Sequence, residues 1–153
     1  MDAEEYYAEG NKKIKAGNHR GAIEDYTKAI ELEPDFLFAY GNRGMAQNHI
    51  GEYAKAIKDF DKAIGLEPKH AHLYVSRANA KIKLDDYEGA LPDLDEAIKL
   101  NPLHVQALNN RAAVRLRLND RQGSVDDFAR VAILNPRYAE ERMKMIEKGK
   151  RMD

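Results

Sequence analysis

The stretch YGNRGMAQ, residues 40–47, brings three different chemistries side by side. Asn42 carries an amide, Arg43 carries a guanidinium, and Gly44 has no side chain. An amide holds a donor and an acceptor together, so it can pair with a peptide group whatever the sequence of the peptide. A guanidinium recognises a carboxylate through two parallel hydrogen bonds. The chemistry on offer is therefore recognition of a peptide or of a carboxylate, not the breaking of bonds.

Other kinds of chemistry have few candidates in the sequence. No nucleophile stands beside a base, and we find neither a glycine-rich phosphate loop nor a pair of catalytic carboxylates. The absence of cysteine excludes disulfides and thiolate metal sites. His70 and His72 form an HxH motif that could meet His49, but such a motif alone is weak evidence for a metal. We expect no enzymatic activity, no cofactor and no metal site.

Composition restricts the partners. The 153 residues suit one domain, with 43% hydrophobic and 33% charged residues. A net charge of -1 gives no bulk attraction to nucleic acid or to an anionic membrane. No apolar run approaches the roughly 20 residues of a membrane span, and MDAEEYYAEG at the start is acidic where a signal peptide is basic. We expect a cytoplasmic protein that binds neither nucleic acid nor membrane.

A period of 34 residues organises the chain. Pro34, Pro68, Pro102 and Pro136 are each 34 residues apart, and the segments that end at them align without a gap. Those segments are AIEDYTKAIELEP, AIKDFDKAIGLEP, ALPDLDEAIKLNP and SVDDFARVAILNP. Repetition at such a period is typical of a solenoid built from stacked units.

Each unit contains two helical patterns separated by a short break. Apolar and small residues follow a spacing of three to four, and no alternation of period two predicts a strand. We predict helices over 3–16, 19–32, 37–50, 53–66, 71–84, 87–100, 105–118 and 121–134. Residues 137–150 predict a ninth amphipathic helix, which would cap the last unit. Pro92 falls inside the sixth helix, where we expect a kink or a late start.

The period, the small residue in the first helix, the alanines and aromatic in the second and the final proline resemble the tetratricopeptide repeat family. The resemblance covers residues 3–138, as repeats 3–36, 37–70, 71–104 and 105–138, with 139–153 as capping helix and tail. It implies an all-α, right-handed superhelical solenoid of four hairpins. The first helices would line a concave groove. Small residues fit where helices approach most closely: Gly10, Gly44, Ala78 and Ala112.

An arginine recurs nine residues after each of the first three of these prolines, and an aspartate recurs in every second helix. A charge that returns in every unit opposite a partner of the other sign predicts a structural pair, not a ligand site. We expect the pairs to join neighbouring hairpins and to leave Asp127 toward the C-terminal cap. The expected pairs are Arg43 with Asp25, Arg77 with Asp59 and Arg111 with Asp93.

The resemblance places the asparagines of the first helices in the groove, where they would bind the backbone of an extended peptide. Four amides at about 1 kcal/mol per hydrogen bond fall short of micromolar binding, so apolar pockets must contribute. Basic residues in the groove would favour an acidic or C-terminal peptide. Solvated polar residues on a wet surface are the alternative. The candidate groove residues are Tyr7, Asn11, Phe38, Asn42, Met45, His49, His72, Val75, Asn79, Lys83, Asn109, Asn110 and Arg117, with Asn48 and Lys15 beside them.

A branch of the resembled family grips the C-terminal carboxylates of heat-shock chaperones with three cations and two asparagines. The matching positions here are Tyr7, Asn11, Asn42, His72 and Ser76. Both asparagines are present and all three cations are absent, so the sequence disfavours this branch. The preferred function is an adaptor that binds a peptide in the groove without catalysis. The alternatives are a scaffold that self-associates and a co-chaperone.

Overall fold

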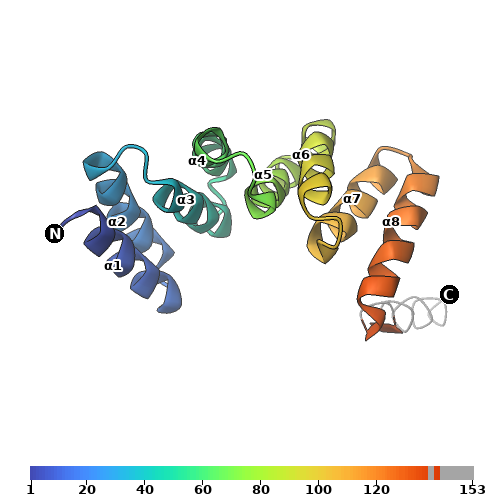
Figure 1. Cartoon of the computed structure of the whole chain (residues 1–153), viewed down its shortest axis with the longest axis horizontal. Coiled ribbons are helices and arrows are strands. Elements are labelled where there is room, and N and C mark those ends of the chain that lie inside the picture. The colour runs from blue at the N-terminus through green and yellow to red at the C-terminus, as the bar shows by residue number, and fades with distance from the viewer. Residues whose placement is uncertain (138–139, 142–153) are drawn as a thin grey trace.

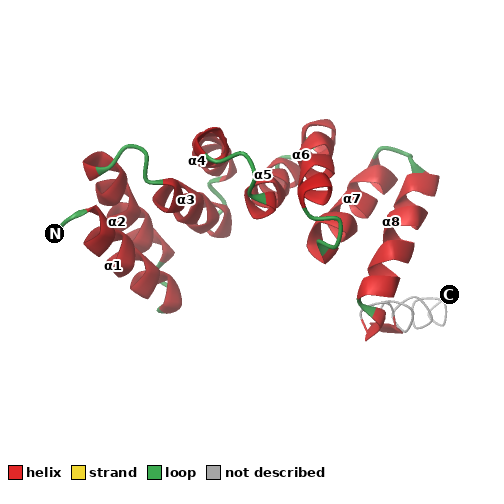
Figure 2. Ribbon diagram, viewed as in Figure 1, coloured by secondary structure: helices red, strands yellow, loops and turns green. Residues whose placement is uncertain are grey.

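The computed structural model describes residues 1–137 and 140–141. Within these residues the chain is helical and contains no strand, and each hairpin follows the last along the molecule (Figures 1 and 2). Every helix boundary lies within one residue of its prediction. The helices are α1 (Ala3–Lys15), α2 (His19–Leu32), α3 (Leu37–His49), α4 (Tyr53–Leu66), α5 (Ala71–Lys83), α6 (Tyr87–Leu100), α7 (Val105–Arg117) and α8 (Arg121–Leu134).

The packing is that of a solenoid. Each odd-numbered helix packs against the even-numbered helix that follows it, and that second helix packs against the first helix of the next hairpin. The first helices α3, α5 and α7 also contact one another in sequence order. The buried apolar residues form three clusters along the array, and each cluster combines residues of two neighbouring hairpins because every hairpin covers the apolar face of the next. The first helices therefore share one side of the molecule.

Small residues allow the two helices of a hairpin to approach closely, as predicted. A Cβ atom on Gly10 would lie 2.5 Å from the ring of Tyr26, and a Cβ atom on Gly44 would lie 2.8 Å from the ring of Phe60. In the third hairpin, Ala78 is completely buried and the residue equivalent to these rings is Leu94. In the fourth hairpin the equivalent residues are Ala112, which is completely buried, and Phe128, so glycine and alanine both fill this position.

The turn inside each hairpin uses one backbone conformation. Gly17, Gly51, Asp85 and Asn119 are spaced 34 residues apart, and their φ angles lie between 59° and 83°. This left-handed region suits glycine, and it is open to asparagine and aspartate because their short polar side chains bond locally. The same turn closes all four hairpins and keeps them congruent.

The second helix of the third hairpin begins at its predicted residue. Helix α6 starts at Tyr87 and runs through Pro92 to Leu100, so the expectation of a late start is wrong. The Asp86 side chain fixes the start by accepting a hydrogen bond from the Gly89 amide. Pro92 removes one helical hydrogen bond there, but its side chain is exposed and the buried face of the helix is unaffected.

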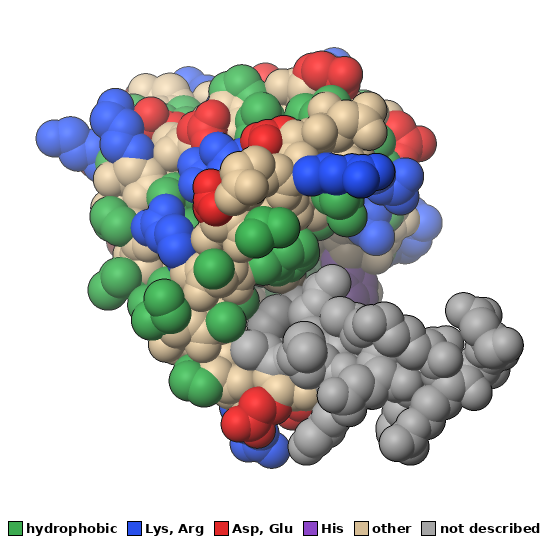
Figure 3. Space-filling view, turned by 90° about the vertical axis from the view of Figure 1, so that its right-hand side faces the viewer, with side chains coloured by type: hydrophobic (Ala, Val, Ile, Leu, Met, Phe, Trp, Pro, Cys, Tyr) green, Lys and Arg blue, Asp and Glu red, His purple; other side chains and the backbone are tan. Residues whose placement is uncertain are grey.

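The array ends at α8, which Figure 3 shows from its outer side with hydrophobic side chains lying among charged ones. Val125 and Ile133 on this helix are 59% and 78% exposed. The ninth helix predicted over 137–150, and the cap and tail over 139–153, lie almost entirely outside the described residues. None of the helices among residues 1–137 and 140–141 is long and apolar enough to cross a membrane.

Candidate peptide-binding groove

Asn11 and Asn42 form the first amide pair, which joins α1 to α3. The Nδ2 atom of Asn42 donates to Oδ1 of Asn11 at 2.9 Å and to Oη of Tyr7 at 3.0 Å. The Tyr26 hydroxyl donates to the same Oδ1 of Asn11 at 2.7 Å. The pair keeps one carbonyl oxygen, on Asn42, and one amino group, on Asn11, outside these bonds.

Asn79 and Asn110 form the second amide pair, which joins α5 to α7. Nδ2 of Asn110 donates to Oδ1 of Asn79 at 2.6 Å. These residues stand 68 positions after Asn11 and Asn42, so the bond is repeated two units further along. This pair also keeps one carbonyl oxygen and one amino group outside the bond. A peptide group has one donor and one acceptor, so each pair offers it a complementary surface.

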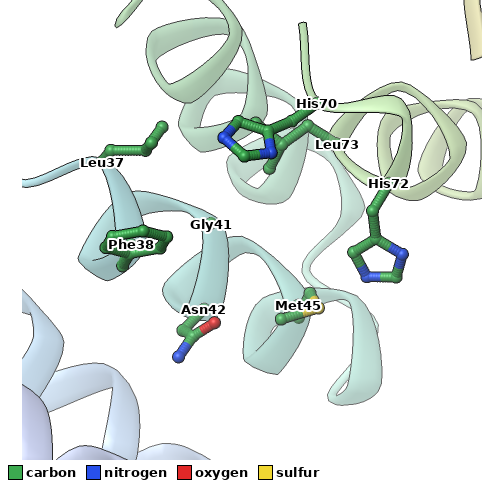
Figure 4. Close-up of a pocket in the computed structure, with 8 residues that line it drawn as sticks. All are labelled: Leu37, Phe38, Gly41, Asn42, Met45, His70, His72 and Leu73. Carbon is green, nitrogen blue, oxygen red and sulfur yellow. The ribbon is translucent and has the colours of Figure 1, made fainter. Parts of the chain in front are cut away.

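An apolar pocket separates the two pairs. At the intermediate interface, the equivalent positions hold Met45, which is 39% exposed, and Ser76, which is buried. Phe38 from α3 is 59% exposed at the same place. Figure 4 shows the residues of α3 on one side of the pocket, with His70 and the α5 residues His72 and Leu73 on the other. The central pocket has a volume of about 150 Å³ and is lined by Leu37, Phe38, Gly41, Asn42, Met45, His70, His72 and Leu73.

A larger pocket lies beside each amide pair, and we call these two the outer pockets. The first has a volume of about 450 Å³ and is lined by Asn11, Ile14, Lys15, His19, Tyr26, Asn42, Met45, Ala46 and His49. The second has a volume of about 440 Å³ and is lined by Asn79, Ile82, Lys83, Tyr87, Asn110, Ala113, Val114 and Arg117. A pocket of about 260 Å³ between them is lined by Met45, Asn48, His49, Tyr53, Asn79 and Lys83.

The groove carries positive charge that the protein does not neutralise. Within the described part of the chain, Lys15 and Lys83 take part in no ion pair, and the Arg117 guanidinium lies over the Tyr87 ring, 5.4 Å from its centroid. His72 adds no charge at neutral pH, because burial, and secondarily the neighbouring His104, lowers the pKa of its imidazole below the usual 6.5. The positive charge of the groove surface thus comes from Lys15, Lys83 and Arg117.

The recurring arginines pair differently from the prediction. Arg43 binds Asp59 of its own hairpin at 2.7 Å, not Asp25 of the preceding one. Asp25 instead pairs with Lys13 of its own hairpin, because Glu9 stands where the later units have the arginine. The expected partners Asp59 for Arg77 and Asp93 for Arg111 are wrong in the same way. Arg77 binds Asp93, and Arg111 binds Asp127.

A link between hairpins does exist, but through other residues. The remaining nitrogen Nη1 of Arg77 donates to Asp61 at 2.8 Å, and Nη1 of Arg111 donates to Asp95 at 2.8 Å, each on the preceding hairpin. Arg43 reaches Thr27 in the same manner. Each arginine therefore binds one residue of its own hairpin and one of the preceding hairpin. These arginines hold the scaffold together, although their partners differ from the predicted ones.

Most of the predicted groove residues line the pockets. Tyr7 is half-buried and supports Asn42, and Asn109 is half-buried on α7. Val75 is 1% exposed and belongs to the core, so its prediction as a groove residue is wrong. The predicted residues that line a pocket are Asn11, Phe38, Asn42, Met45, His49, His72, Asn79, Lys83, Asn110 and Arg117.

Several lining residues were missed by sequence reasoning. Leu37 and Leu73 frame the central pocket, and His19 stacks on His49 with ring centroids 3.7 Å apart. The repeat could have indicated His19, which lies 34 residues before the lining residue Tyr53, but it gives no such indication for Leu37 or Leu73. Among the described residues, no group of three or more acidic or histidine side chains is placed to hold a metal ion.

Comparison with known proteins gives one family. Models of the tetratricopeptide repeat match residues 3–36, 38–70 and 75–140. A small glutamine-rich tetratricopeptide repeat-containing protein 2 of Mycosarcoma maydis is 46% identical over 50 residues, 33% of this chain and 14% of that protein. The human protein named beta of the same type is 41% identical over 49 residues, 32% of this chain and 16% of that protein. These matched segments are a small part of either relative.

Solved structures share the fold over most of the chain. A MamA structure, 23% identical, covers 88% of this chain and 73% of its own with a TM-score of 0.84. The first such domain of Spaghetti (RPAP3), bound to the HSP90 peptide SRMEEVD, is 27% identical and covers 77% and 94% with a TM-score of 0.75. The second domain of human RPAP3, in complex with the HSP70 peptide SGPTIEEVD, is 28% identical and covers 74% and 94% with a TM-score of 0.71.

Proposed function

Because the chain belongs to the tetratricopeptide repeat family, whose members are protein-interaction modules, we propose that its groove binds an extended segment of a partner protein. The observation that carries this proposal is the pair of amide bonds Asn11–Asn42 and Asn79–Asn110. Each amide pair holds its side chains in a fixed position and leaves one donor and one acceptor for a peptide group. The asparagine side chains are thus ordered before the ligand binds, and this lowers the entropy cost of binding.

The central pocket supplies affinity that the amides lack. Hydrogen bonds to the backbone contribute about 1 kcal/mol each, whereas micromolar binding requires roughly 8 kcal/mol. Burying a leucine-sized side chain contributes roughly 1.5–3 kcal/mol. Phe38 and Met45 are exposed side chains that would be covered by such a residue. The ligand is therefore an extended peptide with a bulky apolar side chain near its middle.

The charge of the groove favours an acidic segment. Lys15, Lys83 and Arg117 line the outer pockets and find no carboxylate among the described residues. By contrast, Lys13 on the same helix as Lys15 is paired with Asp25. A peptide with acidic side chains would complete these pairs and would bind less tightly at high salt.

A chaperone tail is a less favoured ligand. Two structural relatives are described with HSP90 and HSP70 peptides, so the comparison keeps a co-chaperone in view. The three positions that supply cations in that branch hold Tyr7, His72 and Ser76. The Tyr7 hydroxyl is engaged by Asn42, His72 is neutral at pH 7 because its pKa is lowered, and Ser76 is buried. None of them offers a fixed positive charge.

Selection from a random peptide library on the immobilised protein tests the proposal, followed by affinity measurement by fluorescence anisotropy. Phe38→Ala and Met45→Ala should each lower the affinity for the selected peptide by at least tenfold. Both should change the stability of the protein little, because the two side chains are exposed. Leu103→Ala, at a residue that is 67% exposed in the loop between α6 and α7, is the matched control and should leave the affinity unchanged. Equal affinities for all three variants would refute binding in the groove.

A second candidate function is self-association through the outer face of α8. The observation that favours it is the exposure of Val125 and Ile133, at 59% and 78%, on the last described hairpin. Light scattering over a concentration series tests this function. A wild-type mass that rises with concentration, and that Val125→Lys returns to the monomer value, would support it. A monomer at every concentration would exclude it.

A further inference from the structure

The two outer pockets are copies of one pocket. Adding 68 to the residue numbers of the first gives eight of the residues that line the second. Asn11, Ile14 and Lys15 become Asn79, Ile82 and Lys83, and the amide pair itself is reproduced. The volumes agree, at about 450 and 440 Å³. The full set of matches is Asn11 with Asn79, Ile14 with Ile82, Lys15 with Lys83, His19 with Tyr87, Asn42 with Asn110, Met45 with Ala113, Ala46 with Val114 and His49 with Arg117.

The intermediate pocket breaks the series. Adding 34 instead of 68 replaces Asn11 by Met45 and Ile14 by Asn48, and the volume falls to about 260 Å³. No amide pair forms there, because Ser76 stands where Asn42 and Asn110 stand in the other interfaces. The amide pair is therefore present between the first helices of units one and two and of units three and four, and absent between those of units two and three.

Each outer pocket has the donors that a carboxylate needs. The last residue of the first helix supplies one cation, Lys15 or Lys83, and neither is neutralised within the described residues. The amide pair supplies the amino group of Asn11 or Asn79 that its own bond does not use. His49 and Arg117 complete the two pockets. Charge-assisted bonds of this kind are among the strongest polar contacts in proteins.

We infer that the two outer pockets bind two acidic side chains of one extended peptide, with an apolar side chain between them in the central pocket. The inference rests on the proposed function and specifies its ligand. First helices of neighbouring units lie about 10 Å apart, so sites two units apart are separated by about 20 Å. An extended chain covers about 3.4 Å per residue, so the two acidic residues stand about six positions apart.

Synthetic peptides test this spacing directly. The probes are acetylated and amidated peptides with two glutamates separated by three to nine positions, a leucine midway and glycine or serine elsewhere. Affinity should pass through one maximum near a separation of six, where the peptide should bind at least tenfold more tightly than a peptide with one glutamate. Two linked contacts bind tightly only when the linker matches the distance between sites.

Variants in the two pockets should act alike. Lys15→Gln and Lys83→Gln should each lower the affinity for the doubly acidic peptide by about tenfold, because each variant removes one of two linked contacts. For a peptide with one glutamate, each variant should weaken binding only about twofold, because the other pocket can still hold the acid. The matched controls are Lys58→Gln and Lys69→Gln, at exposed lysines that line none of these pockets.

The outcomes distinguish the paired acidic sites from peptide binding in the groove as such. If the doubly acidic peptides bind with an affinity that does not depend on spacing, or if Lys58→Gln weakens binding as much as Lys15→Gln does, the paired pockets are refuted while peptide binding stands. If neither these probes nor library peptides bind, the proposed function fails with them. A maximum at one spacing that disappears in both Lys15→Gln and Lys83→Gln supports the inference.

Discussion

Arg43 donates from Nε and Nη2 to the two carboxylate oxygens of Asp59, each at 2.7 Å. The two residues lie 16 positions apart on the two helices of one hairpin, and Nη1 of the same arginine donates to Thr27 of the preceding hairpin at 3.0 Å. A single planar side chain thus fixes both the angle within a hairpin and the contact between hairpins. Because the groove is formed across those contacts, the position of the amide pairs depends on these arginines.

The same geometry gives a test with an internal control at Arg77, which binds buried Asp93 and exposed Asp61. Asp93→Ala should lower the free energy of unfolding by about 3 kcal/mol, because the half-buried Arg77 and Lys81 both lose their buried carboxylate partner. Asp61→Ala should change it by less than about 0.5 kcal/mol, since that carboxylate is exposed. Urea unfolding followed by circular dichroism measures both. Equal losses would mean that burial does not set the strength of these pairs.

Two glycine substitutions should act in opposite directions. Gly44→Ala would bring a Cβ atom to 2.8 Å from the Phe60 ring, so we expect a loss of about 1–3 kcal/mol from overpacking. Gly65→Ala in α4 would meet nothing within 4 Å and should stabilise by about 0.5–1 kcal/mol, because alanine is the better helix former. Thermal unfolding of the two variants checks the difference in sign. A stabilised Gly44→Ala would contradict the close-packing role.

Alkaline unfolding should reveal Tyr26. Burial raises the pKa of its phenol from 10.0 to about 12. A group with a higher pKa in the folded than in the unfolded state stabilises the folded protein fully at pH values below its unfolded pKa. For Tyr26 this stabilisation is therefore present below about pH 10, and it is lost as the pH rises toward 12. Tyr26→Phe loses the bond to Asn11 and should be about 1 kcal/mol less stable at pH 7. The gap to the wild type should narrow above pH 10, and a constant gap would contradict the account.

The helices could be predicted from the sequence almost completely, because period, prolines and turn residues agree on every boundary. The arginine partners could not. Arg43 lies 18 residues after Asp25 and 16 before Asp59, and both aspartates are on second helices that flank it. Spacing alone does not say which of these helices the guanidinium meets. The choice follows from the packing of α3 on α4.

The candidate groove was predictable in part. Exposed groove side chains, such as Phe38 and Met45, could be predicted from their positions on the helix. Val75 lies at the edge of the buried face, where its equivalents Tyr7, Gly41 and Asn109 differ in size and in exposure. Burial at such a position depends on the neighbouring helix, so a single repeat pattern does not decide it. The bond between Asn11 and Asn42 was also hidden, because it joins residues from different units.

The HSP90 peptide SRMEEVD, which a structural relative binds, provides a test of the chaperone alternative. We expect this chain to bind it no more than a few-fold more tightly than a scrambled peptide, since Tyr7, His72 and Ser76 replace the fixed cations. Isothermal titration at two salt concentrations measures the affinity. Micromolar binding that weakens with salt and depends on the C-terminal carboxylate would overturn this expectation and favour a co-chaperone.

The most direct test of the central claim is a nuclear magnetic resonance titration with the library-selected peptide, monitoring side-chain amide signals. The account predicts that the signals of Asn11, Asn42, Asn79 and Asn110 shift together and saturably, because the peptide backbone bonds to the groups that the two pairs leave open. The signals of Asn18 and Asn119, at the turns inside hairpins, should stay in place. Shifts confined to the outer face of α8, with all four groove amides unchanged, would contradict the account.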